Sequence, residues 1–281
     1  MRLTPVTGLA LYYALQSTFA KPVPSKIEAV SVWNKPASQW FDMLTPFGLK
    51  EGKDDSKKSD KGDKKKKKKE PTDAKPVEYH WYTGDGTVAA GWPDEDDWKS
   101  FDDLWDINSA AYICLTPNTP DETSDLHASI LSVSSTTGVD ARFILATIIQ
   151  ESNGNVRVGT TALANANPGL MQSYGPLCSG TCKDIPTTTR CPKSMIEQMI
   201  QDGTASNSAG MGLQDLIAKS GVDDVSKYYR ATRMYNSGPN SIPENGDLSA
   251  ESGAATRTYA SDVANRLVGW VANGAEGQRV W

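Results

Sequence analysis

The stretch Ile148-Ile149-Gln150-Glu151-Ser152 ends a run of mostly apolar residues that starts at Phe143. The apolar positions of this run are spaced as on one broad buried face of a helix. Asp140 is of a type that caps helix N-termini, and Gly154 is of a type that can end a helix. The stretch therefore predicts a buried helix that carries one carboxylic acid, Glu151, to its end, where the acid could border a cleft.

An acid in such a place suits the cleavage of a glycosidic bond, which needs a proton for the leaving oxygen. Burial disfavours the charged carboxylate and raises its pKa, so that a proton is available near neutral pH. On its own, a glutamate at a helix end is more often an exposed surface residue. Two further motifs follow Glu151 in order, Gly169-Leu170-Met171-Gln172 and Tyr235-Asn236-Ser237-Gly238. With these motifs present, a functional role for Glu151 is favoured over an exposed surface residue.

The three motifs together resemble the catalytic region of the goose-type lysozyme and soluble lytic transglycosylase family, glycoside hydrolase family 23. The resemblance covers roughly residues 122–272. It implies a mainly α, lysozyme-like domain and an enzyme that cleaves β-1,4 linkages between N-acetylated aminosugars, in peptidoglycan or chitin. It also implies that Glu151 is the general acid. Hydrolysis and intramolecular transfer both remain open.

The resemblance further implies substrate-binding residues. In the family, the Gly-Leu-Met-Gln segment lines the floor of the cleft, and the Tyr and Asn of the later motif are thought to hold the acid and the sugar acetamido group. Met171 could instead be simple core, and Tyr235 a packing residue of a helix face. The positions carried over are Ser152, Gly169, Leu170, Met171, Gln172, Tyr235, Asn236 and Tyr259.

A second carboxylate, a metal and a cofactor have weaker support. Asp140, Asp184 and Asp202 are candidates for a second acid by sequence region only, and capping is the stronger interpretation of Asp140. A zinc site among the cysteines is disfavoured because the chain has only His80 and His127. We expect no cofactor and no metal.

Composition divides the chain into five parts. Residues 1–20 read as a secretory signal peptide, whose apolar run is too short to span a bilayer. A short N-terminal segment, 21–49, precedes a Lys-rich spacer, 50–76, that should be disordered because it has no aromatic residues. A Trp-rich extension, 77–121, leads to the main domain, 122–281. We expect a secreted, extracellular monomer that is not held in a membrane.

Charge is distributed unevenly between these parts. The spacer has 12 basic and 7 acidic residues, whereas residues 77–281 have 13 basic and 25 acidic ones, a net charge of −12. The spacer could adhere to anionic polymers, but a solvated linker is favoured, and no nucleic-acid partner is expected. The net charge of −12 over residues 77–281 favours a neutral polymer as substrate, or an acidic working pH at which many carboxylates are protonated. A non-catalytic glycan-binding or interaction protein on the same fold is the alternative function.

Tryptophans and cysteines give two further expectations. Trp81, Trp92, Trp98 and Trp105 could stack on sugars, but packing of the extension onto the main domain is favoured. Four cysteines in a secreted chain suit two disulfides, and three pairings are possible. Cys182 with Cys191 would close a short loop, and Cys114 with Cys178 would tie the domain entry to the loop after Gln172.

Helices are expected from a cap at Asp125 to Thr137 and from a cap at Asp140 to Ser152, with later ones near 193–202, 209–219, 223–235 and 254–271.

Overall fold

The computed structural model describes residues 76–162, 166–174, 180–251 and 256–272. The expected signal peptide, the N-terminal segment and all but the last residue of the Lys-rich spacer lie outside the described residues. The rest of this section concerns the described part of the chain.

The described residues fold mainly into α-helices, as the sequence predicts. The helices are α2 (Phe101–Ala111), α3 (Pro120–Thr137), α4 (Ala141–Ser152), α5 (Lys193–Thr204), α6 (Leu213–Lys219), α7 (Ser226–Ser237) and α8 (Tyr259–Leu267). Three short 3-10 helices cover Val88–Ala90, Glu95–Asp97 and Ile113–Leu115. One antiparallel pair of strands, β1 (Thr161–Ala162) and β2 (Ala166–Asn167), was not expected.

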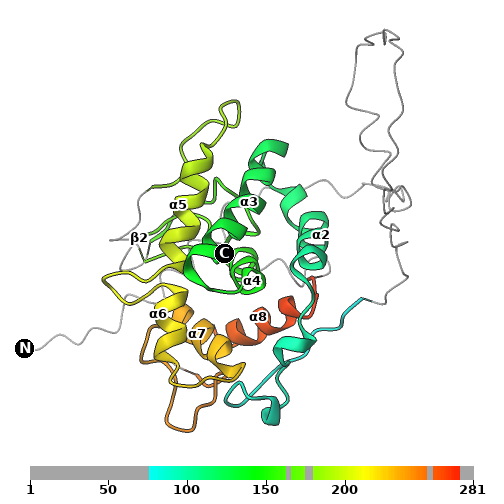
Figure 1. Cartoon of the computed structure of the whole chain (residues 1–281), viewed down its shortest axis with the longest axis vertical. Helices are drawn as coiled ribbons and strands as arrows, with labels where there is room; N and C mark the ends of the chain where they lie inside the picture. The colour runs from blue at the N-terminus through cyan, green and yellow to red at the C-terminus, as the bar shows by residue number, and fades with distance from the viewer. Residues whose placement is uncertain (1–75, 163–165, 175–179, 252–255, 273–281) are drawn as a thin grey trace, which may run out of the picture. The chain divides into compact units, whose positions relative to one another are not determined.

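Helix α4 lies in the middle of the other helices (Figure 1) and packs against α2, α3 and α8. Every side chain from Phe143 to Gln150 is buried. A helix that is buried on all faces needs neighbours around its whole circumference, and this arrangement supplies them. The position of α4 therefore fixes where Glu151, its last residue but one, can lie.

Local capping signals set the ends of α3 and α4. Asp140 caps α4, as predicted, by accepting a hydrogen bond of 2.7 Å from the backbone N–H of Arg142. The prediction that Asp125 caps the preceding helix is wrong. Helix α3 begins at Pro120, because Thr119 and Glu122 form a reciprocal capping box one turn earlier. Asp125 lies inside that helix.

The Trp-rich extension contacts α7 through two buried rings. Trp92 and Trp98 are buried, and the indole N–H of Trp98 donates to the hydroxyl of Tyr229 on α7 at 3.0 Å. That hydroxyl donates in turn to the carbonyl of Pro93 at 2.8 Å. Trp81 differs from these two rings, because 48% of it is exposed.

One of the two expected disulfides is present among the described cysteines. Cys182 and Cys191 are bonded, which closes the short loop between them. The expected second bridge is not formed from Cys114, whose exposed thiol is free and donates to the carbonyl of Ala110 at 3.0 Å. Cys178 lies outside the described residues.

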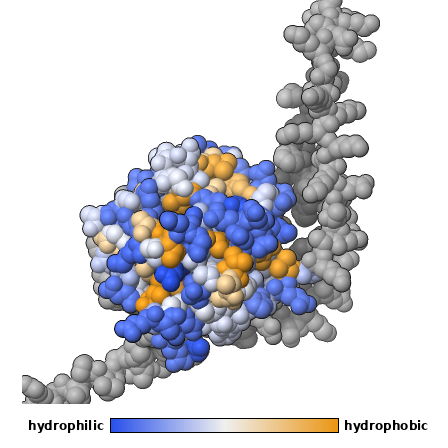
Figure 2. Space-filling view, turned by 60° about the horizontal axis from the view of Figure 1, so that its bottom comes forward, coloured by the Kyte–Doolittle hydropathy of each residue, from blue (hydrophilic) through white to orange (hydrophobic). Residues whose placement is uncertain are grey.

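The face shown in Figure 2 has many hydrophilic residues, with patches of apolar residues between them. No helix in this part is both long enough and apolar enough to cross a membrane.

Close packing between α5 and the Gly169–Gln172 loop generates a prediction. A Cβ added at Gly203 would lie 2.6 Å from the Cβ of Met171 and 2.9 Å from the hydroxyl of Ser173. We expect Gly203→Ala to lower the free energy of unfolding, because overpacking costs about 1–3 kcal/mol. That cost outweighs the gain of roughly 1 kcal/mol in helix propensity. Gly159→Ala is the control, because its Cβ would meet nothing within 4 Å. Chemical denaturation measures both, and equal stability of the two variants would contradict the prediction.

Candidate functional site

Glu151 lies where the buried helix α4 reaches its end. It is partly buried, directly after a turn whose residues are fully covered. Asn153, with φ 54°, ends the helix in a left-handed conformation, one residue before the Gly154 that the sequence indicated. Gly154 also adopts a positive φ, and a Cβ there would lie 2.9 Å from Ile113. The chain therefore turns sharply just beyond the acid.

Among the described residues, the carboxylate of Glu151 has one hydrogen-bond partner, the phenol of Tyr259. The hydroxyl of Tyr259, at the start of α8, donates to Oε1 of Glu151. Burial raises the pKa of Glu151 to about 7, although the hydrogen bond from Tyr259 lowers it in part. Burial, together with the nearby carboxylate, raises the pKa of Tyr259 well above its usual value. The pair therefore combines a carboxyl group that is partly protonated at neutral pH with a phenol that stays protonated.

The Gly169–Gln172 loop forms a tight turn whose apolar side chains point into the core. Gly169 has φ 77°, and a Cβ at this position would lie 2.9 Å from Met199. Leu170 and Met171 are fully buried, so their side chains belong to the core. Of the four positions, only Gln172 is partly exposed.

Gln172 ties this loop to the small sheet. Its Oε1 accepts from the hydroxyl of Thr161 at 2.8 Å, and its Nε2 donates to the carbonyls of Gly159 and Gly169, both at 3.0 Å. Gln172 itself has a positive φ of 45°. Its side chain therefore holds the loop together, and its amide is largely occupied with that contact.

Tyr235 and Asn236, near the end of α7, each bind a different neighbour. The hydroxyl of Tyr235 donates to the carbonyl of Met171 at 2.8 Å, which joins α7 to the loop. The phenol of Tyr235 is also close enough to Tyr259 to raise the pKa of that residue. Asn236 Oδ1 accepts from the backbone N–H of Thr256 at 3.0 Å, just before α8. The phenol that holds the acid is thus Tyr259, and Tyr235 holds the loop.

The structure brings together most of the residues that the sequence indicated. Glu151 contacts Tyr259, Tyr259 lies near Tyr235, and Tyr235 contacts Met171. Ser152 points elsewhere, because its buried hydroxyl donates to the carbonyl of Ile148 within the helix at 3.0 Å.

None of the three candidates for a second acid pairs with Glu151. Asp140 caps the opposite end of α4, about 16 Å away at 1.5 Å of rise per residue, and its carboxylate pairs with Arg142. Asp184 is exposed in the loop that the disulfide closes. Asp202 on α5 accepts from Gln198 at 2.7 Å. Within the described ranges, no group of three or more His, Cys, Asp or Glu side chains could hold a metal ion.

Sequence reasoning missed a polar cluster beside the acid. Gln150 Oε1 accepts from Nε of the buried Arg266 at 2.8 Å, which joins α4 to α8. Asp262, one turn after Tyr259, accepts from the hydroxyls of Tyr79 at 2.7 Å and Thr258 at 3.0 Å. The spacing of three residues between Tyr259 and Asp262 was the available signal, because it places both on one face of α8.

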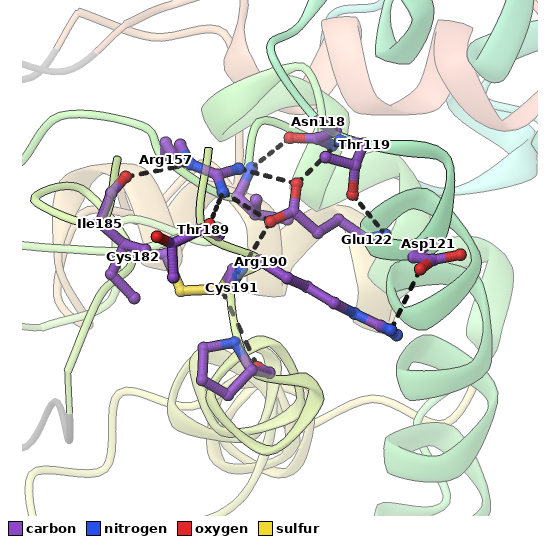
Figure 3. A network of polar contacts seen from close by, with 12 residues as sticks. Asn118, Thr119, Asp121, Glu122, Arg157, Cys182, Ile185, Thr189, Arg190 and Cys191 are labelled. Carbon is purple, nitrogen blue, oxygen red and sulfur yellow. Dashed lines mark hydrogen bonds and ion pairs between the residues drawn. A yellow bond between two sulfur atoms is a disulfide. The ribbon is translucent and has the colours of Figure 1, made fainter. Parts of the chain in front are cut away.

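A buried ion pair fixes the chain that follows Glu151 (Figure 3). Glu122 of α3 binds Arg157 through two hydrogen bonds, of 2.6 and 2.8 Å. The carboxylate also accepts from the backbone N–H groups of Thr119 and Cys191. Asn118 donates to the carbonyl of Gly154 at 2.7 Å. Burial alone would raise the pKa of Glu122. The hydrogen bonds from Arg157, Thr119 and Cys191, together with the charge of Arg157, lower this pKa to about 2.

Comparison with known proteins gives no match: no family model, no curated protein and no solved structure is similar to this chain at a level that assigns a relationship.

The hydrogen bond from Tyr259 generates a prediction about the acid. Tyr259→Phe removes a donor that stabilises the charged carboxylate, so we expect the pKa of Glu151 to rise above about 7. NMR titration of the Glu151 carboxyl carbon measures this shift. The control is Tyr174→Phe, which removes an exposed phenol outside this pair and should leave the titration unchanged. A lower pKa in Tyr259→Phe would show that the hydrogen bond favours the neutral acid instead.

The buried ion pair generates a prediction about acid stability. The folded pKa of Glu122 lies below its ordinary value of 4.5, so its stabilising contribution is complete above pH 4.5 and is lost as the pH falls towards about 2. We expect Glu122→Gln to destabilise the protein by about 3–5 kcal/mol at neutral pH, because Arg157 would be left without its partner. The difference from wild type should shrink over that pH range. Asp121→Asn, at an exposed carboxylate of the same helix, should leave the unfolding midpoint unchanged.

Proposed function

We propose that this protein is a glycosidase that cleaves β-1,4-linked polymers of N-acetylated aminosugars, with Glu151 as the general acid. The observation that carries the proposal is the raised pKa, about 7, of a carboxyl group at the end of a buried helix. A general acid works best when its pKa is near the working pH. The motif resemblance to goose-type lysozymes and lytic transglycosylases supports the same reaction, and it brings a lysozyme-like fold and a secreted location into the proposal.

The proposed reaction uses the proton that burial keeps on Glu151. The acid transfers this proton to the glycosidic oxygen as the C–O bond breaks, so that the leaving sugar gains a hydroxyl group. The oxocarbenium-like sugar is then captured by water or by its own 6-hydroxyl group, and Glu151 takes up the proton that is released. The three candidates for a second acid lie elsewhere: Asp140 pairs with Arg142, Asp184 is exposed, and Asp202 accepts from Gln198, which suits capture with help from the substrate.

The neighbouring residues serve this acid in the proposal. Tyr259 holds the carboxyl group in place, and Tyr235 holds the loop at Met171 beside it. Asn236 presents an amide on the partly exposed end of α7, where it suits an acetamido group. The net charge of −12 over residues 77–281 favours a neutral chain such as chitin over an anionic wall polymer.

The proposal predicts the behaviour of Glu151→Gln. The amide keeps the shape of the side chain but has no acidic proton, so we expect turnover to fall by about 10²–10⁴-fold. Glu244→Gln, at an exposed glutamate of a loop, is the matched control and should keep full turnover. The assay incubates each protein with chitin oligomers and with purified peptidoglycan, and mass spectrometry identifies the products. Products lighter by one water indicate intramolecular transfer, and ordinary reducing ends indicate hydrolysis.

Stability separates a catalytic role from a structural one. The folded pKa of Glu151 is raised, so its charge opposes folding as the pH rises through about 7. Glu151→Gln should therefore be at least as stable as wild type above pH 7. Binding without cleavage by the wild-type protein would instead indicate a non-catalytic glycan-binding protein.

A further inference from the structure

Trp81 is an exposed aromatic residue whose neighbours in the chain form hydrogen bonds with another element. The backbone on both sides of it is fixed to α8. The N–H of His80 donates to Asn265 at 2.8 Å, and the carbonyl of His80 accepts from the same side chain at 2.7 Å. The N–H of Tyr82 donates to the hydroxyl of Ser261 at 3.0 Å. Figure 1 shows this segment, in cyan, beside the red end of α8.

Arg257 lies over the ring of Trp81. Its guanidinium group lies 5.9 Å from the centre of the Trp81 ring, at the distance of a cation–π contact. Arg257 is itself held by the carbonyl of Ser249 and the carboxylate of Glu251, both at 3.0 Å. An aromatic surface is thus fixed in place while 48% of Trp81 remains open to solvent.

This surface adjoins the candidate site through α8. Arg257 precedes Thr258 and Tyr259, and Tyr259 donates to Glu151. Asp262 connects the two regions, because it accepts from Tyr79, two residues before Trp81, and from Gln150, the residue before Glu151. The polar cluster around Asp262 therefore joins the segment that carries Trp81 to the end of the helix that carries Glu151.

We propose that Trp81 and Arg257 form a sugar-binding platform that holds a neutral β-1,4-linked N-acetylglucosamine chain at a subsite distant from the cleaved bond. The proposal rests on the proposed function, because it takes the polymer to pass Glu151. The apolar C–H face of a pyranose packs on an indole ring, and the polar edge of the sugar meets the cluster around Asp262. Trp81 belongs to the Trp-rich extension, so the extension contributes binding as well as packing.

Calorimetric binding in the Glu151→Gln protein tests the platform, because that variant leaves the oligomer intact. Addition of Trp81→Ala should weaken binding of a chitin hexamer about five- to tenfold, and Trp81→Phe should recover most of it. A chitin dimer is too short to reach both the platform and the site at Glu151. The ratio of hexamer affinity to dimer affinity should therefore fall in Trp81→Ala. Val88→Ala, at an exposed residue of the same extension, is the control and should leave that ratio unchanged.

Two measurements keep the outcomes distinct. The indole N–H signal of Trp81, assigned by its loss in Trp81→Phe, should shift on addition of hexamer, and the melting temperatures of all variants should agree. Equal hexamer affinity with and without Trp81 would overturn the platform, whatever the turnover. Dependence of binding on Trp81 without cleavage by wild type would keep the platform and overturn the glycosidase. Absence of hexamer binding to the parent would overturn the platform, whereas the glycosidase is decided by turnover of chitin oligomers and peptidoglycan by the wild-type protein.

Discussion

The burial of α4 on all of its faces is the constraint on which the rest of the structure depends. From Phe143 to Gln150 no side chain reaches solvent, so the helix is stable only inside a ring of other helices. A carboxylic acid at the end of such a helix leaves most of its hydration behind. The raised pKa of Glu151 thus follows from the packing of its helix and does not need a neighbouring negative charge.

Two sets of polar contacts hold the end of α4, one on each side. On one side, Asn118 and the Glu122–Arg157 pair fix the turn that follows the acid. On the other side, Arg266 binds Gln150 and Tyr259 binds Glu151. A buried polar group destabilises the fold unless it has a hydrogen-bond partner. Each of these contacts therefore holds its side chains in one arrangement. The acid therefore lies in a rigid frame, which general acid catalysis requires.

Local signals in the sequence were enough to predict the helices and the place of the acid. The apolar run before Glu151 and the cap at Asp140 depend on neighbouring residues, and both are confirmed. The start of α3 was misread because Asp125 and Thr119 are both good caps, and the capping box with Glu122 decides between them. The partners of polar side chains were harder to predict, because they depend on how distant elements pack.

In the candidate site, too, the contacts between residues far apart in the chain were harder to predict than the local features. The motif resemblance implied that Tyr235 holds the acid, but the phenol that binds Glu151 is Tyr259, 108 residues away in the chain. The inward direction of Leu170 and Met171 follows from the turn at Gly169, which no local periodicity encodes. Asp262 and Arg266 gave only a weak spacing signal along α8, and Gln150, on α4, gave none.

The position of α8 has a consequence for how the chain folds during synthesis. The segment around His80 and the apolar helix α4 both pack on α8, and His80 is 185 residues from its partner Asn265. At roughly 5–20 residues per second, α4 waits on the order of ten seconds for α8 to leave the ribosome. During that time its apolar surface is uncovered on one side. Contacts of such high order also slow folding, so the nascent chain has a prolonged period in which aggregation competes with folding.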